Sequence, residues 1–148
     1  MKNIRHLKQI NAPRQEVWRA LTDSASMEKW IMPNTFEPRL NHEFTFVWGQ
    51  ASDWDGIIHC KIVVLDEPEK LAYTWRGAPG VPETLVTYTL KEEGGVTLLE
   101  LVHSGWEEVT EVHREVYDTL NSGWGSHVLE NLVSLITTGE VKFSTCSD

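Results

Sequence analysis

The feature that most constrains this chain is residues 120–138, where apolar side chains recur with helical spacing. One half of a helical wheel carries Trp124, Val128, Leu129, Leu132, Val133, Leu135 and Ile136. The other half carries His127, Glu130, Asn131, Ser134, Thr137 and Thr138. This division predicts one long amphipathic helix with a broad apolar face, ending at Gly139. Because such a face must be covered, the rest of the chain has to supply a packing surface.

Thr110, Gly123 and Gly125 indicate where this helix begins, where it bends and where it is narrow. We expect it to begin near Glu111, after a cap at Thr110, and to bend or break at Gly123. Gly125 lies within the apolar face, where glycine costs about 1 kcal/mol relative to alanine. Two interpretations of Gly125 remain open: close approach of a neighbouring element, or space for a ligand.

Most of the preceding sequence predicts strands, since apolar and polar residues alternate. Strands are expected over residues 4–10, 43–49, 57–65, 70–76, 83–92 and 96–103. Two short helices, residues 13–22 and 25–30, follow the first strand, with Asp23 and Ser24 as candidate caps. Gly94-Gly95 predicts a hairpin. This order is typical of an α+β fold in which an antiparallel sheet curls around the long helix and leaves a cavity.

Composition limits the classes of partner. The 148 residues suit one domain, expected over 1–140 with a flexible tail at 141–148. A net charge of −9 argues against nucleic acid and anionic membranes as partners. The chain contains no run of 18 apolar residues and no signal-peptide core, and Cys60 and Cys146 are expected to be reduced. We therefore expect a cytoplasmic protein without membrane insertion.

Four stretches, taken in order, resemble a known family. They are residues 10–23 with Met27–Trp30, Leu65–Trp75, Val86–Leu90 with His103–Trp106, and Ser122–Trp124 with the leucines that follow. Together they are similar to the family of activators of heat-shock-protein ATPase, within the START-like or SRPBCC superfamily. The resemblance covers residues 4–139 and implies the helix-grip fold. Members often carry a glycine pair where this chain has Asn41-His42, but asparagine tolerates left-handed turns.

The resemblance also implies a range of functions. Superfamily members bind hydrophobic small molecules, shuttle lipids or cyclise polyketides. The founding co-chaperone stimulates a heat-shock ATPase and uses an additional N-terminal domain, for which this chain is too short. The resemblance therefore implies a hydrophobic small molecule as the first candidate partner, with a heat-shock chaperone or a second copy of this chain as alternatives.

Motifs for catalysis and cofactor binding are missing from the sequence. It has no paired-cysteine or H-E-x-x-H zinc motif, no phosphate-binding glycine loop and no G-x-S-x-G turn. We therefore expect no metal and no cofactor, and assign no catalytic residue. His103 lies on an inward strand face, where it could bind a ligand or act as an acid or base, or be satisfied by a backbone carbonyl. Cys60 is expected to pack in the core.

The candidate ligand-binding residues are aromatic side chains on inward faces, together with His103. They are Trp30, Phe44, Phe46, Trp48, Tyr73, Trp75, Tyr88, His103 and Trp124. These side chains either fill the space between sheet and helix or line a pocket there. Trp30 and Trp124 are expected to be structural first, and Tyr73, Tyr88 and His103 to supply polar contacts.

Three functional hypotheses follow. The first is a non-enzymatic module that binds a hydrophobic or aromatic small molecule between the sheet and the long helix. The second is a co-chaperone or other protein-binding module, for which the acidic residues between Glu107 and Asp118 are either a partner surface or a solvated face. The third is a cyclase or hydrolase that uses His103 with a nearby tyrosine.

Overall fold

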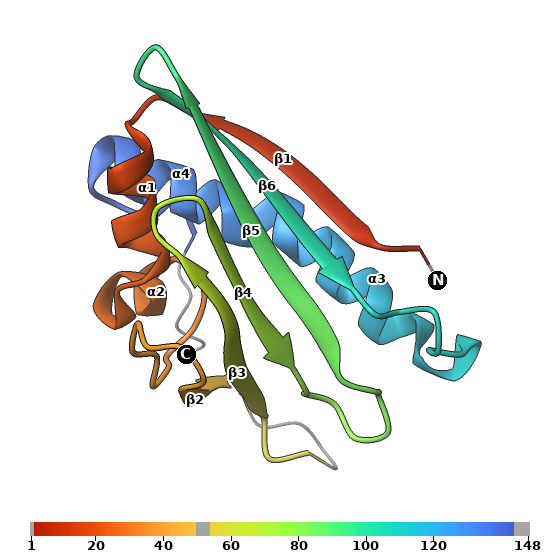
Figure 1. The fold of residues 1–148 in the computed structure, drawn as a ribbon. Coiled ribbons are helices and arrows are strands. Elements are labelled where there is room, and N and C mark those ends of the chain that lie inside the picture. Colours follow the sequence, from red (N-terminus) through yellow and green to blue (C-terminus); the bar gives the residue numbers. More distant parts are fainter. Residues whose placement is uncertain (1, 50–53, 144–148) are drawn as a thin grey trace.

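One antiparallel sheet with helices on a single face makes up the fold (Figure 1). The computed structural model describes residues 2–49 and 54–143. The strands are β1 Ile4–Ile10, β2 Glu43–Val47, β3 Ile57–Asp66, β4 Lys70–Trp75, β5 Thr84–Glu93 and β6 Val96–Ser104. Their order across the sheet is β1-β6-β5-β4-β3-β2, and every neighbouring pair is antiparallel.

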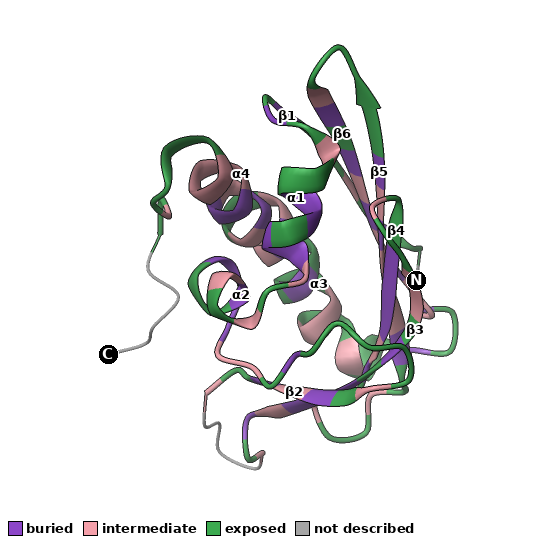
Figure 2. Ribbon diagram, turned by 60° about the vertical axis from the view of Figure 1, so that its left-hand side comes forward, coloured by how far each residue is buried: buried purple, intermediate pink, exposed green. Residues whose placement is uncertain are grey.

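The helices cover one face of the sheet, as Figure 2 shows. They are α1 Arg14–Leu21, α2 Ser24–Trp30, the 3₁₀ turn η1 Glu111–His113, α3 Arg114–Gly123, the π-helical turn η2 Trp124–Val128, and α4 Leu129–Thr138. The elements from η1 to α4 follow one another without a break and form the long C-terminal helix. The expected α+β helix-grip fold, with two short helices after the first strand, is confirmed.

Asp23 and Gly139 mark helix ends as expected, whereas Thr110 precedes η1 without a side-chain capping hydrogen bond. The Asp23 carboxylate accepts a hydrogen bond from the Ser26 backbone amide at 3.1 Å and caps α2. Gly139 ends α4 in the left-handed conformation, at a φ of 84°. Asn41, at the position of the family's glycine pair, also has a left-handed φ of 69°. The departure from the family pattern therefore leaves the backbone turn intact.

The long helix contains a π-helical turn where the sequence predicts a bend or break. The extra residue in this turn rotates everything after it by about 100°. Asn131, predicted on the polar half of the wheel, is nevertheless buried, with 2% of its surface exposed. Its amide donates to the Phe143 carbonyl at 2.9 Å and accepts from the Phe143 amide at 2.7 Å. These bonds attach the residues after α4 to the helix.

Gly125 allows the long helix to approach β1 closely. A β-carbon at this position would lie 2.7 Å from Cε1 of His6 in β1. The His6 ring donates from Nε2 to the Asn121 carbonyl at 3.0 Å. Of the two interpretations of Gly125, close packing against a neighbouring element is therefore correct.

The outer face of the sheet has a bulge in β3. The pairing of β3 with β4 shifts register between Ile62 and Val64. Val63, between them, is 40% exposed. Because of the bulge, Ile62 and Leu65 both pair with inward-facing residues of β4, so the alternation of faces changes phase within β3. Among the described residues, no helix has the length and apolar character needed to span a bilayer.

Candidate functional site

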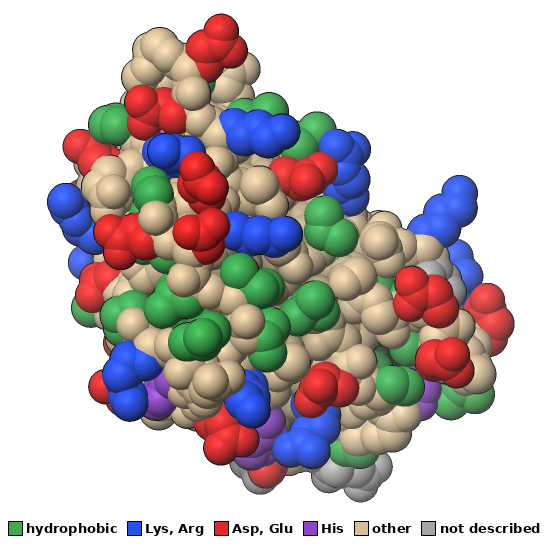
Figure 3. Space-filling view, in the orientation of Figure 1, with side chains coloured by type: hydrophobic (Ala, Val, Ile, Leu, Met, Phe, Trp, Pro, Cys, Tyr) green, Lys and Arg blue, Asp and Glu red, His purple; other side chains and the backbone are tan. Residues whose placement is uncertain are grey.

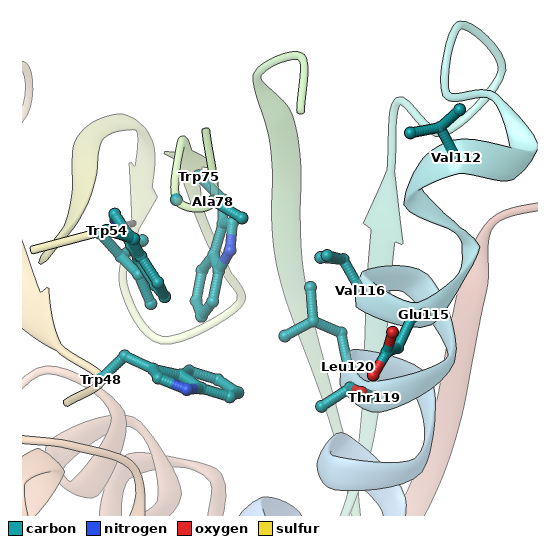
Figure 4. A pocket seen from close by; sticks show the side chains of 11 residues that line it. Trp48, Trp54, Trp75, Ala78, Val112, Glu115, Val116, Thr119 and Leu120 are labelled. Carbon is teal, nitrogen blue, oxygen red and sulfur yellow. The ribbon is translucent and has the colours of Figure 1, made fainter. Parts of the chain in front are cut away.

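An open pocket of about 400 Å³ lies between α3 and the ends of the strands opposite it (Figure 4). Its lining consists of Trp48, Trp54, Ile58, Trp75, Gly77, Ala78, Val112, Glu115, Val116, Thr119 and Leu120. Figure 4 shows three indoles on one side and the side chains of α3 on the other. The space therefore lies between sheet and long helix, where the sequence predicts a cavity.

The three indoles reach the pocket from different places in the fold. Trp75 is the last residue of β4, and its ring packs against Phe46 and Trp124, with 5.7 Å between ring centroids in each case. Trp48 follows β2, and Trp54 precedes β3. Their centroids are 6.5 Å apart, and Trp48 is 45% exposed. The pocket therefore has one fixed wall at Trp75 and a mouth of two indoles that contact each other.

The helical wall is a stripe with a spacing of four residues. Val112, Val116 and Leu120 lie one turn apart, and Thr119 and Glu115 flank them. A smaller hollow of about 50 Å³ shares Trp48, Trp75, Thr119 and Leu120 with the pocket and extends to Trp124. The lining is mainly apolar with a few polar groups, which is typical of small-molecule sites.

His103 lies beside the pocket in a fully paired network. The Trp124 indole donates to Nδ1 at 3.1 Å, so the ring proton is on Nε2. This Nε2 donates to the Thr84 hydroxyl at 2.6 Å, and Thr84 donates to the Trp75 carbonyl at 3.3 Å. Burial lowers the pKa of His103 to about 3. The imidazole is therefore neutral near pH 7, with both nitrogens occupied.

The other buried titratable groups also lie in the core. The Tyr73 and Tyr88 hydroxyl oxygens are 2.6 Å apart. Burial raises the pKa of both phenols. The pKa of the Cys60 thiol is likewise raised, first by burial and then by the charge of Glu83. These groups are therefore uncharged at neutral pH and make poor nucleophiles.

The nine predicted ligand-binding residues divide into two groups. Trp48 and Trp75 line the pocket, and Trp124 lines the smaller hollow. The remaining six form a packed core beside these spaces: Trp30, Phe44, Phe46, Tyr73, Tyr88 and His103. Trp30 also donates to the Ala20 carbonyl at 2.9 Å, consistent with the structural role expected for it.

Sequence reasoning missed most of the pocket lining. Trp54 lies outside the predicted strands, next to residues 50–53, which lie outside the described residues, and Glu115 belongs to the acidic residues interpreted as a solvated face or a partner surface. The stripe Val112, Val116 and Leu120 carried a usable signal, since its spacing is helical. No group of three or more potential metal-ligating side chains occurs within residues 2–49 and 54–143.

Comparison with known families identifies the chain. The family model for Activator of Hsp90 ATPase homolog 1-like proteins matches residues 11–137. The protein belongs to this family. Members of the Activator of Hsp90 ATPase homolog 1-like family bind ligands or proteins. No curated protein matches the chain.

Solved structures of similar proteins share this architecture. Protein MLL2253 from Mesorhizobium loti is 28% identical with a TM-score of 0.80, and the match covers 95% of this chain and 100% of that one. Protein BH1534 from Bacillus halodurans is 27% identical with a TM-score of 0.71, covering 92% and 96%. The Aha1 dimer from Colwellia psychrerythraea is 22% identical with a TM-score of 0.72, covering 94% and 98%. This last likeness concerns the fold alone.

Proposed function

We propose that this member of the family binds an apolar or aromatic small molecule in the pocket between the three indoles and α3. The observation that carries the proposal is the pocket itself. Its volume of about 400 Å³ lies within the range of small-molecule sites, roughly 300–1,000 Å³. Trp48, Trp54 and Trp75 offer large rigid surfaces, and Val116 and Leu120 complete an apolar enclosure.

A binding role, not catalysis, fits the chemistry of the lining. The groups that could act as a base or nucleophile, His103 and Cys60, are buried in the core and are not part of the lining. Glu115 is the titratable side chain that borders the pocket among the described residues. One carboxylate without a second acid, base or nucleophile supplies no assignable reaction.

A variant whose own side chain fills the pocket tests the proposal directly. Val116→Trp places an indole in the space, while Val63→Trp adds the same ring on the outer face of the sheet. We expect Val116→Trp to lose the thermal stabilisation that drug-sized apolar ligands give, and Val63→Trp to keep it. Thermal shift and calorimetric titration measure both. If no apolar or aromatic ligand in a broad panel binds the unaltered protein, the proposal fails.

Protein binding is the second candidate function, and two observations favour it. The family model concerns Hsp90 ATPase activators. The exposed residues before and on α3 are also predominantly acidic, with Arg114 as the base among them: Glu107, Glu108, Glu111, Glu115 and Asp118. A charge-dependent complex with an Hsp90 chaperone weakens with added salt and with Glu107→Lys plus Glu108→Lys. Absence of any association at low salt rejects this candidate.

Two further proposals concern the cellular location of the protein and its self-association. We infer a cytoplasmic setting, supported by Cys60, which is a buried free thiol. The relative from Colwellia psychrerythraea is a dimer, so a second copy of this chain is a further candidate partner. Sedimentation analysis over a range of protein concentrations measures that state directly.

A further inference from the structure

The pocket has one sign of charge. Glu115 is the charged side chain among the residues that line it, and neither lysine, arginine nor histidine borders it in the described part of the chain. Arg114, on the same helix, lies 3.2 Å from the Glu111 carboxylate and 3.7 Å from that of Asp118. The positive charge of Arg114 is thus already paired with acids, and the pocket faces a carboxylate.

The opposite wall also favours positive charge. The faces of aromatic rings carry negative electrostatic potential, and tryptophan attracts cations most strongly of the aromatic side chains. Trp48, Trp54 and Trp75 lie across the space from Glu115 and Val116 (Figure 4). A positively charged group within the pocket therefore meets indoles on one side and a carboxylate on the other.

We infer that the ligand is a lipophilic cation, such as an amine or quaternary ammonium with an apolar substituent. This inference depends on the proposed function and narrows it to one ligand class. The cationic group lies between the indoles and Glu115, and the apolar part occupies the space beside Val116 and Leu120. An anionic ligand of the same shape meets the carboxylate without a compensating base.

Net charge alone does not account for such a preference. The chain carries −9 overall, but the outer face of the sheet mixes Lys and Arg with Asp and Glu, as Figure 3 shows. Exposed charges also act weakly beyond about 8–10 Å at physiological salt. Selectivity for a cation must therefore come from the pocket lining, and an experiment can separate the two sources.

The test uses three probes that share a benzene ring bearing a branched group of three methyls. They are phenyltrimethylammonium, its neutral isostere tert-butylbenzene, and the anion 4-tert-butylbenzoate. Tryptophan fluorescence and calorimetry at physiological salt give the affinities for the unaltered protein and for two variants. Glu115→Gln removes the pocket carboxylate. Glu107→Gln makes the same chemical change outside the lining and controls for total charge.

We expect the cation to bind about tenfold more tightly than its neutral isostere. Glu115→Gln weakens binding of the cation by about fivefold and leaves tert-butylbenzene unchanged, and Glu107→Gln changes neither. Equal or tighter binding of the neutral or anionic probe overturns this inference but leaves the proposed function intact, as does an unchanged cation affinity in Glu115→Gln. Failure of all three probes to bind also overturns this inference, whereas the proposed function fails only if the broad panel of apolar and aromatic ligands fails as well.

Discussion

Two aromatic regions meet along the inner face of the sheet, and they differ in what lies opposite them. In the core around His103, Tyr73 and Tyr88, each of these three polar side chains has a hydrogen-bond partner and is almost completely buried. At the pocket, Trp48 is 45% exposed and Trp54 is half-buried. Aromatic side chains therefore serve as packing in one region and as an accessible surface in the other.

Trp75 belongs to both regions and shows what separates them. Its ring contacts His103 at a centroid distance of 5.4 Å on the core side, and its other side borders the pocket. On the core side, Trp124 comes from the long helix and fills the space. On the pocket side, the lining side chains of α3 are valine, leucine, threonine and glutamate, none of which is as large as an indole. The side chains of the helix therefore decide where the cavity opens.

The largest expected difference between the regions is in stability. Trp124→Ala removes an indole that is 2% exposed and leaves Nδ1 of His103 without its donor. We expect a loss of about 3–5 kcal/mol in the free energy of unfolding, measured by urea denaturation. Trp48→Ala, the matched change at the pocket mouth, should cost about 1 kcal/mol or less. Equal losses would show that both regions are packed core.

The second expected effect is a dependence of stability on pH that arises in the core region, at His103. His103 is neutral in the folded state down to about pH 3, whereas in the unfolded chain it is protonated below its ordinary value of 6.5. The unfolded state therefore binds more protons as the pH falls below 6.5, and stability decreases. We expect a slope approaching about 1.4 kcal/mol per pH unit below that value.

Denaturation between pH 6.5 and 5 measures this slope above the range in which carboxyl groups titrate. His103→Gln is the comparison, because its amide can accept from Trp124 and donate to Thr84. We expect a flatter profile in the variant. The same slope in both proteins would show that His103 is not the group responsible.

The smallest expected effect is the change in stability when either of two glycines in the long helix is replaced by alanine. A β-carbon at Gly123, beside the smaller hollow, meets nothing within 4 Å, whereas one at Gly125 lies 2.7 Å from His6. We expect Gly123→Ala to add about 0.5–1 kcal/mol of stability. Gly125→Ala should show no gain or a loss, because the His6 ring must move. In a His6→Ala background, Gly125→Ala should recover the gain, and thermal denaturation of the double-mutant cycle measures this.

Most of the fold could be predicted because its signals are local. Alternation in Leu71, Tyr73 and Trp75 marks an inward strand face, and Asp23 and Gly139 mark helix ends through their own backbone chemistry. The position of Asn131 could not be predicted in this way. Its two hydrogen-bond partners are backbone groups of Phe143, beyond the end of α4, and a helical wheel does not include residues that follow the helix.

The candidate site was less predictable, because alternation shows which face a side chain occupies but not whether that face is covered. Phe44, Phe46 and Trp48 share one parity, yet Trp48 lies beyond the end of β2 and is half-exposed. Trp54 lies just before β3, in a stretch of sequence that has no periodic signal. Glu115 was predicted on a solvated face, and it is exposed and also borders the pocket.

The sequence by itself determined the elements, their inward faces and the family, since these depend on periodicity, capping residues and the order of motifs. Only the tertiary structure decided where packing ends and the pocket begins. That boundary depends on which side chains of the long helix oppose which strand ends across the sheet. Residues far apart in the chain, such as Trp48, Trp75 and Glu115, become neighbours only when the sheet closes over the helix.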